Sequence, residues 1–364
     1  MIRRLRLSDF RNYNSLSLVF DSKINLIIGD NGQGKTNLLE AIYFLSFLRS
    51  FRTNRADLIK QTGSSNLEIE STVLFNNYHK DFKVIYGENK LLKIDGNDVK
   101  RASDFIGFIK PVVFTHDDIK LISSSARYRR RYLDILLSSA DKLYLNNLHN
   151  YITALKSRNS VLRCSNDDYL LKAYDPILAK YGQKIIDARY KIISDLEKKA
   201  DSFIKKIKGT NYNLNLLYYS KIKQKQNTEE NFISILNSEN ERDRSRTYTG
   251  IGPHMDDLLV FLNGKNLKNY GSVGQCRLCT LCIKMAEAEI IAEKEKNLSI
   301  ALIDDVTGEL DSKTKDAFYS VTDKFGQLFY TFCRESEDLL FKNANKYFVA
   351  DGKVTKEYDN AINV

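Results

Sequence analysis

The sequence lacks any uncharged apolar stretch of the roughly 18 residues that a membrane-spanning helix needs. The opening segment MIRRLRLSDF lacks the apolar core and small-residue cleavage site of a signal peptide. Cysteine is scarce, with five in 364 residues and no spacing typical of a disulfide framework. We therefore expect a cytoplasmic protein with reduced thiols and no membrane partner.

Charge of one sign is in excess. The net charge of +10 and the isoelectric point near 9.1 favour a polyanionic partner, because Lys and Arg release counterions when they meet phosphates. The same excess is typical of a lysine-rich solvated surface, so charge alone leaves both interpretations open. The 43% hydrophobic and 28% charged residues are typical of a globular chain long enough for a sizeable core.

Two kinds of periodicity divide the chain. Alternating or continuous apolar residues predict strands at 2–8, 15–20, 24–28, 67–75, 82–87, 91–94 and 111–114. Apolar residues from Lys35 to about 48 recur at helical spacing. Between about 126 and 208 the spacing is three and four throughout, which predicts a helical insertion. Its two arms are too short for an extended coiled coil, so we expect a compact antiparallel arm.

The strand at 24–28 runs into GDNGQGKT, a complete phosphate-loop pattern, and a helix follows. Its glycines let the backbone N–H groups turn toward phosphate oxygens at the positive end of that helix. Lys35 is predicted to reach the β- and γ-phosphates and Thr36 to bind Mg²⁺. The predicted nucleotide-binding set is Gly29, Asp30, Asn31, Gly32, Gln33, Gly34, Lys35, Thr36 and Asn37.

A second apolar run, LSIALIDD, ends in two acids. A phosphate loop needs a carboxylate at the end of a neighbouring strand to hold the metal, which assigns Asp304 to Mg²⁺. Asp305 is predicted to orient the attacking water, so Lys35 and Asp305 are the candidate catalytic pair. ATP and Mg²⁺ are the expected ligands.

Between these motifs, Ser272, Gly274 and Gln275 open a predicted helix, and GELD follows the acids at 308–311. The ordered set resembles an ABC-type ATPase head: phosphate loop, signature segment, metal-binding strand and D-loop. In such heads the signature of one protomer closes over the γ-phosphate held by the other. The resemblance implies an ATP-dependent homodimer in which Ser272, Gly274 and Gln275 act in trans and Glu309, Leu310 and Asp311 form the D-loop.

Longer segments resemble the RecF family of bacterial recombinational-repair proteins. They are LRLSDFRNYNSL at 5–16, GDNGQGKTNLLEAIYFLS at 29–46, RSFRT at 49–53, RYRRRYLDILL at 127–137, LKSRNSVLR at 155–163 and TYTGIGPHMDDL at 247–258. The resemblance implies an α/β fold, an ABC-type P-loop ATPase head with a β-rich lobe and a helical insertion arm. The expected divisions are 1–125 and 211–364 for the two parts of the head, and 126–210 for the arm.

The RecF resemblance also implies function. Such proteins bind duplex DNA and duplex/single-strand junctions, hydrolyse ATP slowly, and act with RecR and RecO to help RecA load at gaps. Related heads further imply that Arg11 and Asn12 contact the nucleotide. Three residues depart from the family pattern, Gly271 and Cys276 beside the signature and Gly308 in the D-loop, and they put dimer-dependent hydrolysis in question.

Basic residues gather at both ends of the predicted arm. We predict DNA phosphate contacts at Arg127, Arg129, Arg130, Arg131, Lys205 and Lys206, without base reading. A solvated helix face is the alternative for each cluster. Cys276, Cys279 and Cys282 are spaced three apart on one helix and cannot converge on a single metal ion, so we expect small core residues.

Other functions remain as alternatives. A head of the SMC type, acting as a structural or nuclease-partner subunit, would need far longer heptad arms. A transporter ATPase subunit is disfavoured by Thr331 near the position where a switch histidine is expected. A small-molecule kinase would leave the signature and GELD segments unused.

Overall fold

The computed structural model describes residues 1–53, 55–75, 78–164, 167–223, 228–294, 299–333, 341 and 344–357. The chain divides into two compact units. Unit 1 comprises Met1–His116 and the chain from Ala288 onward, and unit 2 comprises Asp117–Glu287. The first predicted boundary, at 125, lies close to this division. The predicted boundary at 210 is wrong, because residues 211–287 remain with the helices of unit 2.

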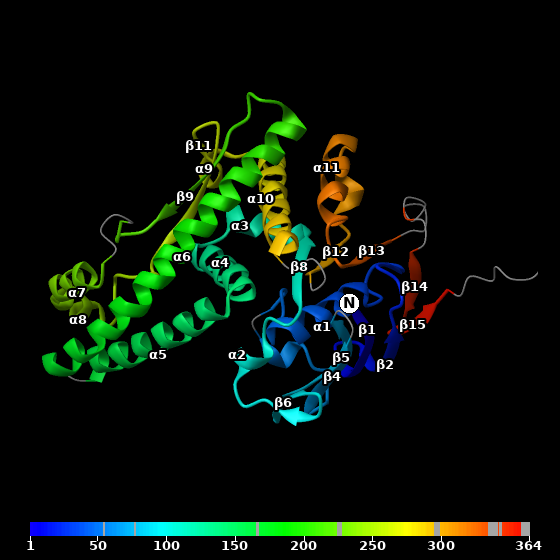
Figure 1. The fold of residues 1–364 in the computed structure, drawn as a ribbon, viewed down its shortest axis with the longest axis horizontal. Helices are drawn as coiled ribbons and strands as arrows, with labels where there is room; N and C mark the ends of the chain where they lie inside the picture. Colours follow the sequence, from blue (N-terminus) through cyan, green and yellow to red (C-terminus); the bar gives the residue numbers. More distant parts are fainter. Residues whose placement is uncertain are drawn as a thin grey trace, which may run out of the picture. The chain divides into compact units, whose positions relative to one another are not determined.

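Unit 1 contains two six-stranded sheets (Figure 1). The antiparallel sheet has the order β2-β1-β4-β5-β6-β7. Its strands are β1 (Ile2–Phe10), β2 (Tyr13–Val19), β4 (Asn66–Phe75), β5 (Tyr78–Gly87), β6 (Lys90–Ile94) and β7 (Asn97–Asp98). The predicted strands of this lobe are confirmed, and β5 begins earlier than predicted because it pairs with β4 along its length.

The second sheet has the order β15-β14-β3-β13-β12-β8 and is parallel except for β15. Its strands are β3 (Ile24–Ile28), β8 (Lys110–Thr115), β12 (Ser299–Asp304), β13 (Gln327–Phe332), β14 (Asn345–Ala350) and β15 (Lys353–Lys356). Parallel strands place their carboxyl ends at one edge, so the residues after β3, β13, β12 and β8 gather there.

Helix α1 (Lys35–Phe47) lies at the centre of unit 1. It contacts β8, β12 and β13 of the parallel sheet, while Phe44 packs edge-on against Phe10 and Tyr86 of the antiparallel sheet. Eleven of its thirteen residues are buried. A helix buried on nearly all sides belongs inside a core, and this burial fixes the phosphate loop at its start. Short helix α2 (Ala102–Phe105) and α11 (Ser312–Thr322) complete the unit.

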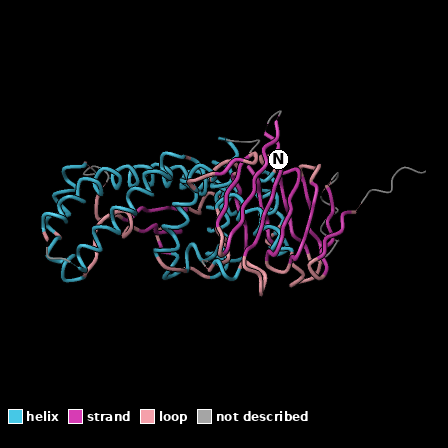
Figure 2. The backbone as a smooth tube through the Cα atoms, turned by 90° about the horizontal axis from the view of Figure 1, so that it is seen from below, coloured by secondary structure: helices cyan, strands magenta, loops and turns pink. Residues whose placement is uncertain are grey.

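Unit 2 is mostly helical (Figure 2). Its helices are α3 (Lys120–Ser123), α4 (Ala126–Ala140), α5 (Lys142–Cys164), α6 (Asp168–Lys208), α7 (Glu229–Ser238), α8 (Asn240–Arg246), α9 (Leu267–Tyr270) and the first part of α10 (Val273–Lys294). The three-stranded sheet β11-β10-β9 consists of β9 (Leu214–Tyr219), β10 (Asp257–Leu262) and β11 (Lys265–Asn266). Helices α5 and α6 pack along each other and form the predicted arm. No helix in the described part of the chain is both long and apolar enough to cross a bilayer.

Buried ion pairs join the elements of unit 2. Arg158 on α5 is fully buried and binds Asp175 and Asp243 at 2.9 and 2.8 Å. Arg189 on α6 binds Asp134 at 2.7 Å. Removing one partner of such a pair leaves a buried charge without compensation. These pairs tie α4, α5, α6 and α8 to one another.

The segment TYTGIGPHMDDL packs onto the arm through His254. Tyr151 donates its hydroxyl to His254 Nδ1 at 2.7 Å, and His254 Nε2 donates to the Thr249 carbonyl at 2.8 Å. These contacts define the neutral ring with its proton on Nε2. Burial lowers the pKa of His254 to about 4. The histidine is therefore a structural residue of unit 2.

This burial makes the stability of unit 2 dependent on pH. The unfolded chain protonates His254 below about pH 6.5, whereas the folded chain does so only near pH 4, so stability falls as pH drops through that window. The contribution amounts to about 3 kcal/mol by pH 4. We expect His254→Gln to flatten the dependence in urea unfolding between pH 7 and about pH 4.5. His149→Gln, at an exposed position of α5, is the control, and an unchanged slope in His254→Gln would contradict this role.

Candidate nucleotide-binding site

The phosphate loop connects β3 to α1. Gly32 and Gly34 have φ values of +83° and +117°, a conformation that side chains rarely adopt. A Cβ at Gly34 would lie 2.6 Å from Asn12 Nδ2, and one at Gly29 would lie 2.3 Å from the Val349 carbonyl oxygen. The loop is therefore closely packed by neighbouring segments, and glycine is required at 29 and 34 for space.

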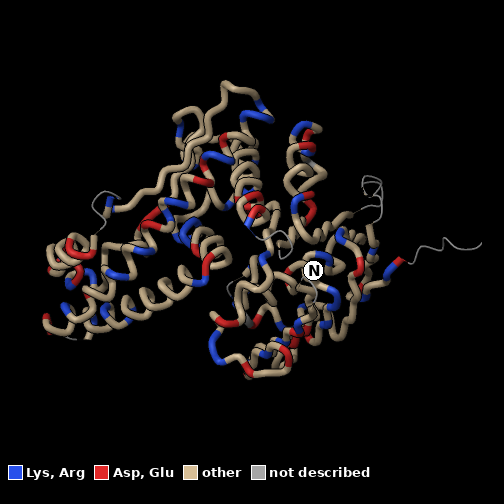
Figure 3. The backbone as a smooth tube through the Cα atoms, viewed as in Figure 1, with Lys and Arg blue, Asp and Glu red and all other residues tan. Residues whose placement is uncertain are grey.

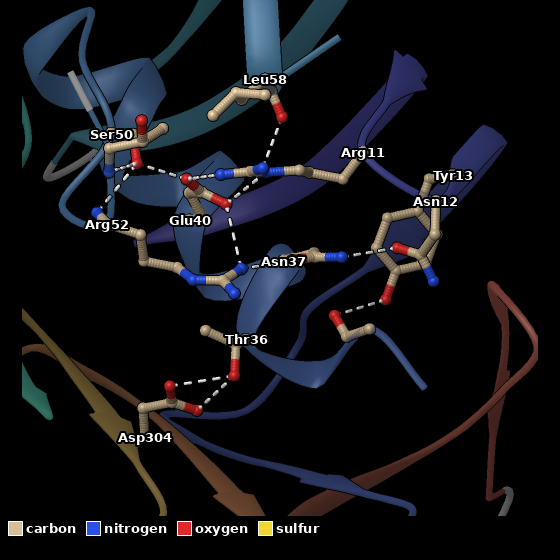
Figure 4. Close-up of polar contacts among 12 residues, drawn as sticks. Arg11, Asn12, Tyr13, Thr36, Asn37, Glu40, Ser50, Arg52, Leu58 and Asp304 are labelled. Carbon is tan, nitrogen blue, oxygen red and sulfur yellow. Dashed lines mark hydrogen bonds and ion pairs between the residues drawn. The ribbon is translucent and has the colours of Figure 1, made fainter. Parts of the chain in front are cut away.

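The two predicted metal-binding side chains meet. Thr36 Oγ1 lies 2.9 Å from both carboxylate oxygens of Asp304, and Thr331 donates to Asp304 Oδ1 at 2.9 Å (Figure 4 shows the first contact). Burial raises the pKa of Asp304, and the hydroxyls of Thr331 and Thr36 act against that rise. A hydroxyl and a carboxylate are hard oxygen ligands, the type that Mg²⁺ prefers. The donor set fits the ion.

Lys35 is buried at the start of α1, and its Nζ donates to the carbonyls of Gly29 and Asp30 at 2.5 and 2.8 Å. The ammonium thus lies against the phosphate loop, beside the place where it is predicted to reach the β- and γ-phosphates. Asp305 follows β12 with φ of +54°, and its Oδ2 lies 3.4 Å from Cys333 Sγ. The structure therefore brings Lys35, Asp304 and Asp305 to one edge of the parallel sheet.

The turn between β1 and β2 supports the loop. Asn12 Nδ2 donates to the Gln33 carbonyl at 2.9 Å, and the Tyr13 hydroxyl donates to the Gly34 carbonyl at 3.0 Å. Asn37 Nδ2 donates to Asn12 Oδ1 at 2.8 Å. Asn12, predicted to contact the nucleotide, is thus placed at the loop and holds its backbone, and Figure 4 shows its contact with Asn37.

Glu40, a buried glutamate on α1, binds side chains from the segments beside the helix. Arg11 binds Glu40 with two hydrogen bonds of 2.8 and 2.7 Å, and Ser50 donates to the same carboxylate. Arg52 lies 3.6 Å from Glu40 and donates to Asn37 Oδ1 at 2.8 Å (Figure 4). The structure therefore directs the Arg11 side chain to α1. Sequence reasoning missed Glu40, although a charged residue inside the apolar run LLEAIYFL was a signal.

The signature segment begins α10 in unit 2. Ser272 and Gln275 form a reciprocal capping box: Gln275 N donates to Ser272 Oγ at 3.2 Å and Ser272 N donates to Gln275 Oε1 at 3.0 Å. Both residues are exposed, and a Cβ at Gly274 would meet nothing within 4 Å. The segment is an accessible helix N-terminus with its backbone N–H groups at a positive end.

Two of the departures from the family pattern form one contact. A Cβ at Gly271 would lie 2.8 Å from Cys276 Sγ and 2.6 Å from the Leu267 carbonyl oxygen. The space beside Gly271 is therefore filled by the Cys276 sulfur and the Leu267 carbonyl, and a side chain at 271 would meet both. Cys276, Cys279 and Cys282 are all buried free thiols, in agreement with their prediction as core residues.

The predicted D-loop forms a 3₁₀ turn, Thr307–Glu309, before α11. Asp311 caps α11 by accepting from Thr314 N at 2.9 Å. Leu310 is half-buried between them, and Gly308 is exposed in the turn. The side chain of Glu309 lies outside the described residues.

The basic residues of α4 differ in exposure. Arg129 is 2% exposed and binds both carboxylate oxygens of Asp257 at 2.6 and 2.9 Å, so the predicted DNA contact is wrong for this residue. Arg130 is half-buried and donates to the Asp256 carbonyl at 2.7 Å. Arg127 and Lys206 are exposed, and Arg131 and Lys205 are half-exposed. Successive residues of a helix point in different directions, and Arg129 is the arginine of the run that faces β10.

Fold and site together define an ABC-type P-loop ATPase head with a β-rich lobe and a helical insertion. The family model described as "RecF/RecN/SMC N terminal domain" matches residues 1–355. Among curated relatives, the "DNA replication and repair protein RecF" of Clostridium perfringens (strain 13 / Type A) is 34% identical over 359 residues, which cover 97% of this chain and 99% of that protein. That of Clostridium novyi (strain NT) is 37% identical over 313 residues, covering 85% and 87%.

Solved structures agree with this assignment. The "Structure of the recombination mediator protein RecF-ATP in RecFOR pathway" is 31% identical, covers 98% of this chain and 99% of that chain, and superposes with a TM-score of 0.90. An SMC head from Pyrococcus furiosus, with a TM-score of 0.56 at 14% identity, shares the fold alone. The chain belongs to the RecF family of DNA replication and repair proteins, as its sequence motifs predicted.

Proposed function

We propose that this chain is an ATP-dependent DNA-binding protein of recombinational repair and replication restart, acting in the cytoplasm. The observation that carries the proposal is the contact of Thr36 with Asp304 at the end of a complete phosphate loop, in a chain similar to an ATP-bound RecF structure. Residues 29–37 bind the triphosphate, and Thr36 with Asp304 holds Mg²⁺. The ion supplies positive charge against the phosphate oxygens.

The second half of the site comes from another copy of the chain. Ser272, Gly274 and Gln275 lie at an exposed helix N-terminus, which suits an anion presented by a partner. Leu310, Asp311 and Glu309 follow the metal-binding strand and are assigned to the same dimer face. In this proposal ATP closes a two-fold dimer and slow hydrolysis, with water oriented by Asp305, opens it.

DNA and accessory proteins are the proposed partners. The relative of known structure is described as a mediator in the RecFOR pathway, and we extend RecO and RecR, and RecA indirectly, to this chain on that likeness. The DNA is duplex or a duplex/single-strand junction. Binding relies on phosphate contacts, so it is strongly dependent on salt.

Helix α6 carries exposed lysines suited to those contacts, with the acidic residues Asp187 and Asp195 beside them (Figure 3 shows basic and acidic residues along it). Lys184, Lys191 and Lys198 are exposed and recur every seven residues, which places them about 20° apart around the helix and about 10 Å apart along it. The face continues to Lys205 and Lys206. Its opposite side is buried, so the lysines are held on one side of a rigid rod.

Replacing these three lysines with glutamine tests the DNA part of the proposal. We expect Lys184→Gln, Lys191→Gln and Lys198→Gln together to weaken ATP-dependent binding of a gapped duplex at least tenfold, and to reduce the slope of log K against log salt by about 2 to 3. Fluorescence anisotropy at several salt concentrations measures both. The matched control replaces the exposed lysines Lys156, Lys172 and Lys268 of the same unit, with the same loss of charge.

Two results would count against different parts of the proposal, the role of the α6 face and the ATP dependence of DNA binding. Equal losses in both triple variants would show that net charge, and not the α6 face, attracts DNA. Wild-type protein that binds gapped duplex equally with and without ATP would contradict the proposed function itself.

A further inference from the structure

The residues that follow three neighbouring strands converge on Asp305. In the parallel sheet β12 lies between β13 and β8, and Asp304 is paired with Thr331 on one side and Thr115 on the other. The chain leaves these strands at Asp305, Cys333 and His116. Parallel strands in this register bring such residues together at one edge of the sheet.

His116 holds the main chain of Asp305. Its Nε2 lies 2.7 Å from the Asp305 carbonyl oxygen. A carbonyl only accepts, so Nε2 carries the hydrogen and donates it. The contact fixes the peptide group that follows Asp305.

Cys333 lies on the carboxylate side of the same residue. Its Sγ is 3.4 Å from Asp305 Oδ2 and 3.0 Å from Asn31 Oδ1, and Lys35 Nζ approaches the sulfur at 3.8 Å. Burial raises the pKa of the Cys333 thiol, so the group keeps its hydrogen at neutral pH and donates to one oxygen at a time. Asp305 is therefore contacted from both neighbouring strands.

The backbone of Asp305 needs this support. Its φ of +54° lies in the left-handed region, which costs a non-glycine residue roughly 1 kcal/mol. Aspartate tolerates this region better than most residues, but nothing in the conformation itself directs the carboxylate toward the loop. External contacts supply that direction.

We propose that His116 and Cys333 are positioning residues that hold the carboxylate of Asp305 in place for hydrolysis. The inference rests on the proposed function, because it assigns Asp305 to the attacking water. Neither residue belongs to the phosphate loop or the Thr36–Asp304 pair, and His116 contacts only the main chain of Asp305. Loss of the His116 contact therefore slows turnover and leaves nucleotide affinity unchanged.

A pair of His116 variants tests the inference. We expect His116→Ala to lower kcat about tenfold or more with KM changed less than about twofold, because only an interaction needed for turnover is lost. His116→Gln keeps an N–H donor at a similar reach and restores kcat to within about threefold of wild type. His149→Ala, at an exposed histidine, is the control. Binding of a non-hydrolysable ATP analogue shows that each variant is folded.

A double variant shows whether His116 acts through Asp305. In an Asp305→Asn background, His116→Ala should change the residual turnover less than twofold, since the group that it positions is already lost. For the other side, Cys333→Ser keeps a donor and should exceed Cys333→Val in kcat.

Several results would overturn the inference. One is equal turnover of His116→Ala and wild type. Another is failure of His116→Gln to restore turnover. The third is a loss of turnover on adding His116→Ala to Asp305→Asn that is as large as the loss in the wild-type background. Failure of the wild-type chain to bind ATP would instead contradict the proposed function. Wild-type protein that binds ATP but never hydrolyses it would contradict both.

Discussion

Lys35→Ala is expected to weaken ATP binding by about ten- to a hundredfold. Lys35 Nζ is buried and lies among the carbonyls of its own loop, 2.8 Å from the Asp30 oxygen. It is the cation placed to meet the phosphates, and a hydrogen bond to a charged group contributes about 1.5–3 kcal/mol. Without it the loop retains its N–H groups but loses the full positive charge that balances the triphosphate.

Isothermal titration with a non-hydrolysable analogue and Mg²⁺ measures this loss directly. Lys313→Ala removes an exposed lysine of α11 in the same unit and serves as the matched control. Unfolding by heat without nucleotide should be similar in both variants, which excludes a general loss of structure. Affinity of Lys35→Ala within threefold of wild type would contradict the assignment of residues 29–36.

The Ser272→Arg variant is expected to bind ATP normally and to remain a monomer in its presence. The substitution removes the cap of α10, at a cost of about 1 kcal/mol, and places a long cation at an exposed helix N-terminus where a phosphate must approach closely. Residues of the phosphate loop belong to the other unit and are untouched. The two functions therefore separate in this variant.

Sedimentation with ATP and Mg²⁺ distinguishes the outcomes. The matched control is Ser160→Arg, at an exposed position of α5, which should form the dimer as wild type does. If Ser272→Arg also sediments as a dimer, the signature segment does not close over the nucleotide.

The candidate nucleotide site was predictable because each of its parts is a short pattern in the sequence, although the parts lie far apart along the chain. The phosphate loop needs glycines, a lysine and a threonine at fixed spacing, and the metal-binding acid ends an apolar strand. The structure places Thr36 against Asp304 as that reasoning required. Boundaries of α1 and the strands also followed from apolar spacing, since burial on one or both faces dictates that spacing.

The residues that escaped prediction act over long separations. Glu40 accepts from Arg11 and Ser50, and His116 donates to Asp305 across 189 residues. The charge inside an apolar run marked Glu40 itself, but no local pattern indicates the partners in either contact. The division at 210 was wrong because β9, β10 and the start of α10 pack within unit 2 although their sequence resembles the β/α pattern of the head. Arg129 was misassigned because the run RRR does not indicate which of its three side chains faces the core.

Mixing two inactive variants shows whether each proposed nucleotide site is built from two copies of the chain. Lys35→Ala lacks a working phosphate loop and Ser272→Arg lacks a working signature, so a mixed dimer contains one intact site and one doubly defective site. We expect that neither variant alone hydrolyses ATP, and that an equal mixture recovers up to about half of the wild-type turnover. An equal mixture as inactive as its components, beside an active wild type, would show that the two halves of a site do not come from two copies of the chain.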